Sequence, residues 1–302
     1  MNTKAKFSWG HIIAFVALIL ISYGTFMGAA YSANGRLWIA GVFVVVIDIL
    51  LLFFSLTPQF LKGVSKKDAP RMRPIEDILF YVSPVVFVVA LMLPFSPFAH
   101  FTNVLQHKKS VETNFNTAIT SADKIFEDYK SYADARIEAH NATFSDTTHF
   151  DKLAVKSYQD ALQLLLVPNS YEQLRKDAQE WMETSCKDAT IWNVFTVGNI
   201  NEIESAVNGW HDFLAHCSQK SLSTESNPKS FDTDNTAMQN STASISEIKN
   251  VFKDRSFSII AIFACILFYA MMMLPYFLQE RDSGISRKGS KAETIISDDI
   301  II

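Results

Sequence analysis

The residue best placed to do chemistry is Asp48, the one carboxylate that the sequence puts deep inside a long apolar run. It lies near the middle of residues 37–56, where an ionised side chain costs a few kcal/mol unless it is paired, protonated or exposed to water. Ser22 and Tyr23 fall at a similar depth in the preceding apolar run and could donate hydrogen bonds to Asp48. Two interpretations stay open: a neutral Asp48 that fastens two membrane helices together, or a proton or cation site.

Two of the cysteines could form a covalent bond. Cys186 and Cys217 lie in the long polar region of the chain, whereas Cys265 lies inside an apolar run. Outside the cytoplasm a disulfide can persist, and a bridge between Cys186 and Cys217 would close a loop of about 30 residues and stabilise the fold by about 3–4 kcal/mol. The alternative is a pair of buried free thiols.

No other residues have the spacing of a metal or catalytic site. The seven histidines form no ligand pattern, and the sequence contains no HExxH, CxxC or G-x-S-x-G motif and no glycine-rich phosphate loop. We therefore expect no metal, no cofactor and no enzymatic activity. The net charge of −4, without a basic patch interleaved with aromatic residues, argues against a nucleic-acid partner.

The elements that must position these residues are four apolar runs, each long enough for the roughly 20 residues that a helix needs to cross a bilayer. Charged residues make up only 19% of the chain, and the apolar residues are clustered. The predicted membrane helices are Ile12–Tyr31, Leu37–Leu56, Ile78–Phe98 and Phe257–Leu278. The predicted fold class is all-α, with four transmembrane helices and an extracytoplasmic helical bundle inserted between the third and the fourth.

The basic loop Lys62–Arg73 sets the predicted orientation. It carries five Lys or Arg residues against one Asp, and short basic loops stay in the cytoplasm. We therefore expect a plasma-membrane protein with both termini in the cytoplasm. The predicted domains are three transmembrane helices in residues 1–98 with a basic cytoplasmic loop at 62–73, an extracytoplasmic α-helical domain in 99–256, a fourth transmembrane helix in 257–279 and a cytoplasmic tail in 280–302.

Within residues 99–256, apolar positions recur every three or four residues, as they do in helical bundles. Residues 98–140 contain no Gly or Pro, so we expect one long helix rising from the third span. A second apolar seam, in residues 238–252, runs towards the fourth span, and we expect these two helices to pair antiparallel. At least two more helices lie between them, and the polar segment Ser218–Thr236 is expected to be a mobile loop.

Two further features concern packing in the membrane. Gly24 and Gly28 form a small-xxx-small pattern that lets another helix approach closely, although glycine is also simply common in membrane helices. Pro84 should kink the third span, and Pro94 and Pro97 should loosen it where it leaves the membrane.

Function stays a hypothesis on these residues. The first hypothesis is that the extracytoplasmic domain senses or binds an external ligand or partner, and relays or anchors through paired helices continuous with the third and fourth spans. The second is an ion- or proton-conducting subunit centred on Asp48, and the third is a structural component of an envelope complex. The expected partners are membrane lipid and either another protein or a second copy of the chain.

Overall fold

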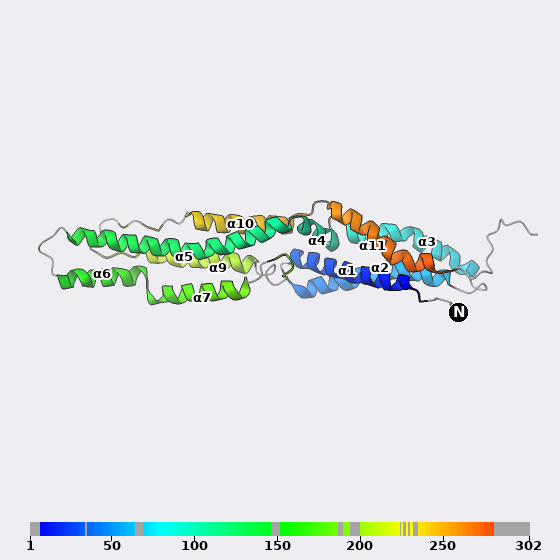
Figure 1. Ribbon diagram of the computed structural model, residues 1–302, viewed down its shortest axis with the longest axis horizontal. Coiled ribbons are helices and arrows are strands. Elements are labelled where there is room, and N and C mark those ends of the chain that lie inside the picture. The colour runs from blue at the N-terminus through cyan, green and yellow to red at the C-terminus, as the bar shows by residue number, and fades with distance from the viewer. Residues whose placement is uncertain are drawn as a thin grey trace, which may run out of the picture.

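The computed structural model is an elongated, all-helical molecule in which two helical bundles lie end to end (Figure 1). It describes residues 7–33, 35–63, 69–145, 152–186, 190–193, 200–223, 225, 228, 230–231 and 235–280. Most of these residues are helical, and no strand occurs among them. The all-α prediction is therefore confirmed for the described part of the chain.

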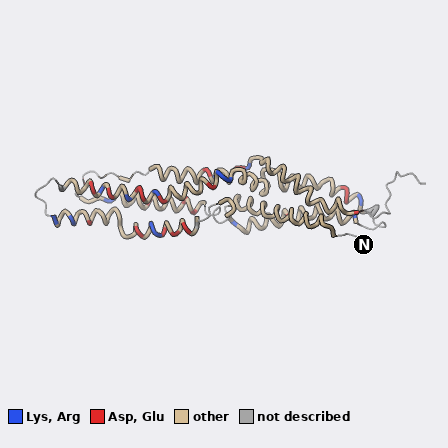
Figure 2. Tube along the Cα trace, in the orientation of Figure 1, with Lys and Arg blue, Asp and Glu red and all other residues tan. Residues whose placement is uncertain are grey.

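One bundle consists of four helices that are long and apolar enough to cross a membrane, as predicted. They are α1 (Trp9–Ser32), α2 (Leu37–Lys62), α3 (Ala69–Phe87) with its π-helical continuation η1 (Val88–Met92), and α11 (Ile259–Leu278). We call this set the membrane bundle. α1 packs against α2 and α11, and α2 packs against α3. Apart from Asp48, the charged residues of these helices lie at or near their ends, and Figure 2 shows a long stretch of this bundle without Lys, Arg, Asp or Glu colours.

The third candidate span runs from Met72 to Met92, so it starts and ends earlier than the predicted Ile78–Phe98. It ends where Leu93 adopts an extended conformation, with φ −71° and ψ 147°. Pro94 explains this conformation, because a proline ring clashes with a helical backbone at the residue before it. The chain therefore leaves the membrane bundle before the apolar run itself ends.

Pro84 does not end α3. The Ser83 hydroxyl donates a 2.8 Å hydrogen bond to the Phe80 carbonyl, the group that Pro84 cannot pair because it has no N–H. A neighbouring serine is a common way to satisfy the backbone at a proline inside a membrane helix. The helix continues and widens into the π-helical turn η1 a few residues later.

The second bundle, which we call the outer bundle, contains five helices among the described residues. They are α5 (Lys108–Ser145), α6 (Lys152–Leu166), α7 (Asn169–Ser185), α9 (Ile200–Ser218) and α10 (Thr236–Lys253). α5 and α10 pack antiparallel, as their seams predict: the Ser241 hydroxyl donates to the Ala118 carbonyl at 3.1 Å, and Asn103, just before α5, bonds Asp254, just after α10. The predicted seam of α5 is buried at Val111, Phe115, Ala118, Ala122, Ile125 and Tyr129.

The prediction of a single helix over residues 98–140 is wrong. A separate short helix, α4 (Pro97–Gln106), ends at His107, and α5 starts after it. Ser96 caps α4, and Pro97 occupies its first turn, where a missing N–H costs nothing. At the other connection, residues 254–258 are not helical, and Ser258 caps α11. The paired helices of the outer bundle are therefore not continuous with the third and fourth spans.

Candidate functional site

The structure places Asp48 against Ser22, near the middle of α1 and α2. The Ser22 hydroxyl oxygen lies 2.7 Å from Asp48 Oδ2 and 2.7 Å from the Leu18 carbonyl oxygen, while Asp48 Oδ1 is buried without a partner. A hydroxyl has only one hydrogen to donate, so both contacts are satisfied together only when Asp48 is protonated and donates to Ser22. This arrangement favours the neutral fastening between two helices over the cation site.

Tyr23 is directed away from Asp48. Its ring stacks on Trp192, with the centroids 6.4 Å apart, and meets Phe101 edge to face. Ser22 and Tyr23 share a depth in the sequence, but neighbouring residues lie about 100° apart around a helix. One of the two therefore faces α2, and the other faces α4 and the outer bundle.

Gly24 and Gly28 lie where α4 crosses α1. A methyl group on Gly28 would sit 1.8 Å from the Pro97 carbonyl oxygen, and one on Gly24 would sit 2.7 Å from the Phe98 ring. Real atoms cannot approach so closely, so a methyl group at Gly28 would displace the backbone of α4, and one at Gly24 would displace the Phe98 ring. The close approach that these glycines permit joins α1 to a helix outside the four spans.

The connections between the two bundles are tied to each other by polar contacts. Asn103 Nδ2 donates to Asp254 Oδ2 at 3.2 Å, and Gln106 Nε2 donates to Ser258 Oγ at 2.8 Å. The Tyr31 hydroxyl donates to the Ile191 carbonyl at 2.7 Å. Every α4 residue from Pro97 to Val104 is buried, so this short helix is enclosed on all sides. We call α4 with residues 254–258 the junction.

His100 lies inside the junction. Its side chain is 1% exposed, and its ring nitrogens meet backbone groups of Phe252 and Asp254 only in poor hydrogen-bond geometry. The Tyr31 ring meets it edge on, with centroids 6.1 Å apart. Burial, reinforced by the charge of Arg255, lowers the pKa of His100 to about 4. This histidine is neutral near pH 7, because a buried imidazolium would lose its hydration.

A second polar cluster joins all four membrane helices at the end opposite the outer bundle. Gln59 Nε2 and His11 Nε2 are 2.9 Å apart, and the Tyr276 hydroxyl donates to Glu76 at 2.9 Å. Lys62 Nζ donates to the Tyr276 carbonyl at 2.8 Å and lies 4.5 Å from the centre of the Tyr276 ring. Sequence reasoning missed the carboxylate of Glu76, which is 1% exposed, because the predicted third span began after it.

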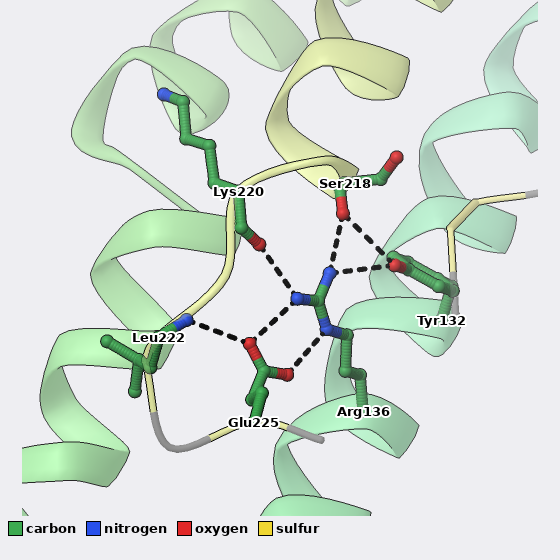
Figure 3. A network of polar contacts seen from close by, with 6 residues as sticks. All are labelled: Tyr132, Arg136, Ser218, Lys220, Leu222 and Glu225. Carbon is green, nitrogen blue, oxygen red and sulfur yellow. Dashed lines mark hydrogen bonds and ion pairs between the residues drawn. The ribbon is translucent and has the colours of Figure 1, made fainter. Parts of the chain in front are cut away.

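Sequence reasoning also missed a buried ion pair in the outer bundle, between Arg136 of α5 and Glu225 (Figure 3). Two parallel hydrogen bonds of 2.8 Å join the guanidinium to the carboxylate, and each side chain is 6% exposed. Arg136 also donates to the carbonyls of Ser218 and Lys220, at 2.6 and 2.7 Å. Burial opposes ionisation of Glu225, but the hydrogen bonds from Arg136 outweigh it and lower the pKa of Glu225.

This ion pair holds a segment that was expected to be mobile. Arg136 of α5 bonds Ser218 at the end of α9 and Lys220 and Glu225 after it, and Phe231 is buried in the outer core. The contacts hold these residues in place, and the expectation of a mobile loop stays a prediction for the rest of the segment.

The cysteine prediction needs a correction as well. Cys186 and Cys217 are both buried in the outer core but remain free thiols, and Cys265 is a free thiol in α11. The two sulfur atoms do not come within bonding distance, so the Cys186–Cys217 disulfide is absent. Burial raises the pKa of Cys186 to about 11 and raises that of Cys217. The thiols therefore stay protonated and act as small apolar side chains.

Within the described residues, no group of three or more His, Cys, Asp or Glu side chains could hold a metal ion. The polar clusters instead join helix to helix or loop to helix. Comparison of the chain with protein-family models, with curated proteins and with solved structures finds no match. What the chain does must therefore be argued from its own residues.

Proposed function

We propose that this is a multi-pass membrane protein whose outer bundle binds an external partner or ligand and is mechanically coupled to the membrane bundle through the junction. In this proposal both termini face the cytoplasm, because the basic residues 62–73 favour that side, and residues 99–256 lie outside the cell. The observation that carries it is the enclosure of α4. A flexible tether would leave this helix exposed, whereas every residue from Pro97 to Val104 is buried.

The route of coupling runs through packed side chains at the junction. α4 touches α1 through Gly24 and Gly28, and it touches the segment after α10 through Asn103. A movement of α5 or α10 must therefore shift α4 or break these contacts, because close-packed interfaces respond as units. This route replaces the uninterrupted paired helices that the sequence suggests.

The test compares the full chain with a variant in which a short flexible linker replaces residues 108–253. Both are purified in mild detergent from the native cell, and the captured proteins are identified by mass spectrometry. The proposal expects at least one protein to be captured by the full chain and lost with the outer bundle. Identical captured sets would contradict it and would favour a structural role for the membrane bundle alone.

The second candidate function is ion or proton conduction at Asp48, and the buried, unpartnered Oδ1 atom is the observation in its favour. Asp48→Asn should abolish conduction in liposomes if the carboxylate carries the ion. Flux that is absent from the wild-type protein, or unchanged by this substitution, would remove the candidate. External binding should be unaffected by Asp48→Asn in either case.

A further inference from the structure

The outer bundle contacts α1 through a short segment, Thr190–Asn193. The Tyr31 hydroxyl of α1 donates to the Ile191 carbonyl at 2.7 Å, and the Ile191 side chain is fully buried. The next side chain, Trp192, does not enter the core. It stacks on Tyr23 and lies 6.0 Å from the Phe101 ring, measured between centroids. The segment is therefore held against α1, and the indole of Trp192 lies on the surface of the molecule.

The surface around this indole continues the lipid-facing side of α1. Trp192 is 40% exposed and Tyr23 is 46% exposed. Below them on α1, Ile19 and Leu20 are about half exposed, as expected for side chains that face acyl chains. The exposed apolar face of a membrane helix thus runs without a break onto a tryptophan of the outer bundle.

The level of Trp192 follows from the packing of α1 on α11. Gly10 of α1 touches Pro275 and Leu278 near the far end of α11. The two helices run antiparallel, and each rises about 1.5 Å per residue, so Tyr23 is level with the first two turns of α11. Trp192 contacts Tyr23 and follows Ile191, whose carbonyl accepts from Tyr31 in the last turn of α1. The indole therefore lies between the levels of Tyr23 and Tyr31, towards the outer end of α1, where indole rings are favoured because one end is apolar and the other is wet.

A cation stands directly above this indole. Lys108 Nζ lies 5.5 Å from the centre of the Trp192 ring. Lys108 Nζ also lies 3.9 Å from Glu112 Oε1, and the Lys108 side chain is 44% exposed. An exposed pair at that distance is weak, so the ammonium keeps donors available for a stronger acceptor. The ammonium, and not the electron-rich face of the ring, is the group that would bind an anion here.

We propose that Trp192 and Lys108 bind the headgroup of a phospholipid in the leaflet next to the outer bundle. The indole lies against the glycerol region, and the Lys108 ammonium donates to a phosphodiester oxygen, a charge-assisted contact. The segment Thr190–Asn193 thereby becomes a second membrane attachment of the outer bundle, besides the junction. This inference does not depend on which side of the cell the outer bundle faces, so it can fail or hold independently of the proposed function.

The first test measures the depth of Trp192 in phosphatidylcholine vesicles that contain the full chain. The lipids are brominated either near the carbonyl end or near the methyl end of the acyl chain, and the wild-type emission is compared with that of Trp192→Phe. The emission that this substitution removes should be quenched about twofold more by the shallow label, as for an interfacial indole. Trp210→Phe is the matched control, because Trp210 is buried in the outer core. Trp192 emission that neither label quenches would overturn the inference.

The second test uses Lys108→Gln and its matched control Lys124→Gln, an exposed lysine further along α5. Retention of phosphatidylglycerol by the detergent-purified protein is measured by native mass spectrometry. Lys108→Gln should lower the fraction of protein that carries one lipid by about threefold, and Lys124→Gln should leave it unchanged. Equal lipid retention in Lys108→Gln and wild type would overturn the role of the ammonium. Equal losses of lipid in both variants would overturn a specific site, because any lysine would then serve.

Discussion

Each bundle of this protein holds a carboxylate between its helices, Glu225 in the outer bundle and Asp48 in the membrane bundle, and the surroundings of the two differ. Glu225 in the outer bundle receives two hydrogen bonds from Arg136 and one, of 3.0 Å, from the Leu222 N–H. Asp48 in the membrane bundle has one neighbour, the Ser22 hydroxyl, which is also bonded to a carbonyl. Three donors, two of them on a charged guanidinium, stabilise a carboxylate anion, whereas a shared hydroxyl suits a neutral carboxyl. The number of donors, rather than burial alone, sets the state of each group.

The two bundles also differ in the size of the residues that pack between their helices. The outer core is filled by large rings, among them Phe126, Tyr129, Tyr171 and Trp210, because burial of apolar surface from water drives its assembly. In the membrane bundle small residues bring backbones together, as at Gly10 against α11. Lipid is as apolar as the side chains, so close packing and hydrogen bonds must hold these helices together. The same chain therefore follows two packing rules on either side of the junction.

The largest effect that this comparison predicts is for Arg136→Met. The substitution leaves the Glu225 carboxylate buried without its counter-charge, with the Leu222 N–H as its remaining donor, and it removes the bonds from Arg136 to two carbonyls. It should therefore destabilise the outer bundle by about 3–5 kcal/mol. Thermal unfolding in detergent, followed by tryptophan emission, measures the loss. The double variant Arg136→Met/Glu225→Leu removes both charges and should recover much of the stability. A double variant no more stable than the single one would show that the backbone contacts of Arg136, and not the ion pair, matter.

The next effect is a pH dependence that originates at His100. The pKa of His100 is about 4 in the folded protein, below the usual value of about 6.5. Between these two pH values the unfolded chain binds a proton at His100 and the folded chain does not. The contribution of His100 to the free energy of unfolding should be fully present above about pH 6.5. It should fall by up to about 3 kcal/mol as the pH drops towards 4.

The variant His100→Phe should lose this component of the pH dependence, and Gly41→Ala, which changes no titratable group, should keep it. Asp254 and Arg255 are the charged residues nearest to the ring, and they stay in place in both variants. The measurement is unfolding in detergent at a series of pH values. Parallel pH profiles for wild type and His100→Phe would mean that the imidazole is solvated in the folded state.

Gly28→Ala tests the packing rule of the membrane side. The added methyl group must displace the Pro97 backbone, so α1 and α4 should separate at a cost of about 1–3 kcal/mol. Gly41→Ala in α2 is the matched control, because nothing lies within 4 Å of the methyl group added there. The two variants should differ clearly in the midpoint of thermal unfolding. Equal midpoints would imply that α4 slides along α1 without loss.

How far the sequence predicts this structure depends on how local each signal is. The seam of α5 and the lengths of the four spans depend on spacing within one helix, so they could be predicted. The neighbourhood of Ser22 and Asp48 was also predictable, since a short turn joins α1 to α2 and fixes their relative depth. Pro94 and Pro97 marked the place where the third span loosens, and the Ser96–Pro97 pair is a helix-start signal that was available.

Other features depend on residues far apart in the chain. Arg136 falls on the continued seam of α5, where a charged residue signals a buried partner, but nothing in the spacing points to Glu225, which lies beyond α6, α7 and α9. The enclosure of α4 depends on α1, α11 and the outer bundle together. The missing disulfide shows the same limit: Cys186 and Cys217 share one core, yet both remain free thiols.

The smallest predicted effects concern the Ser22–Asp48 contact, and they separate a fastening from an ion site. Asp48→Asn keeps a neutral side chain that can donate to Ser22, so stability should change by less than about 0.5 kcal/mol, whereas Asp48→Leu removes the interhelical bond and should cost about 1 kcal/mol. Unfolding of both variants in the same detergent gives the comparison. If Asp48 is ionised in the folded protein, Asp48→Asn should instead raise stability markedly, because it removes a charge from an apolar surrounding. The change in stability on Asp48→Asn therefore decides whether Asp48 is ionised, as Glu225 is, or neutral.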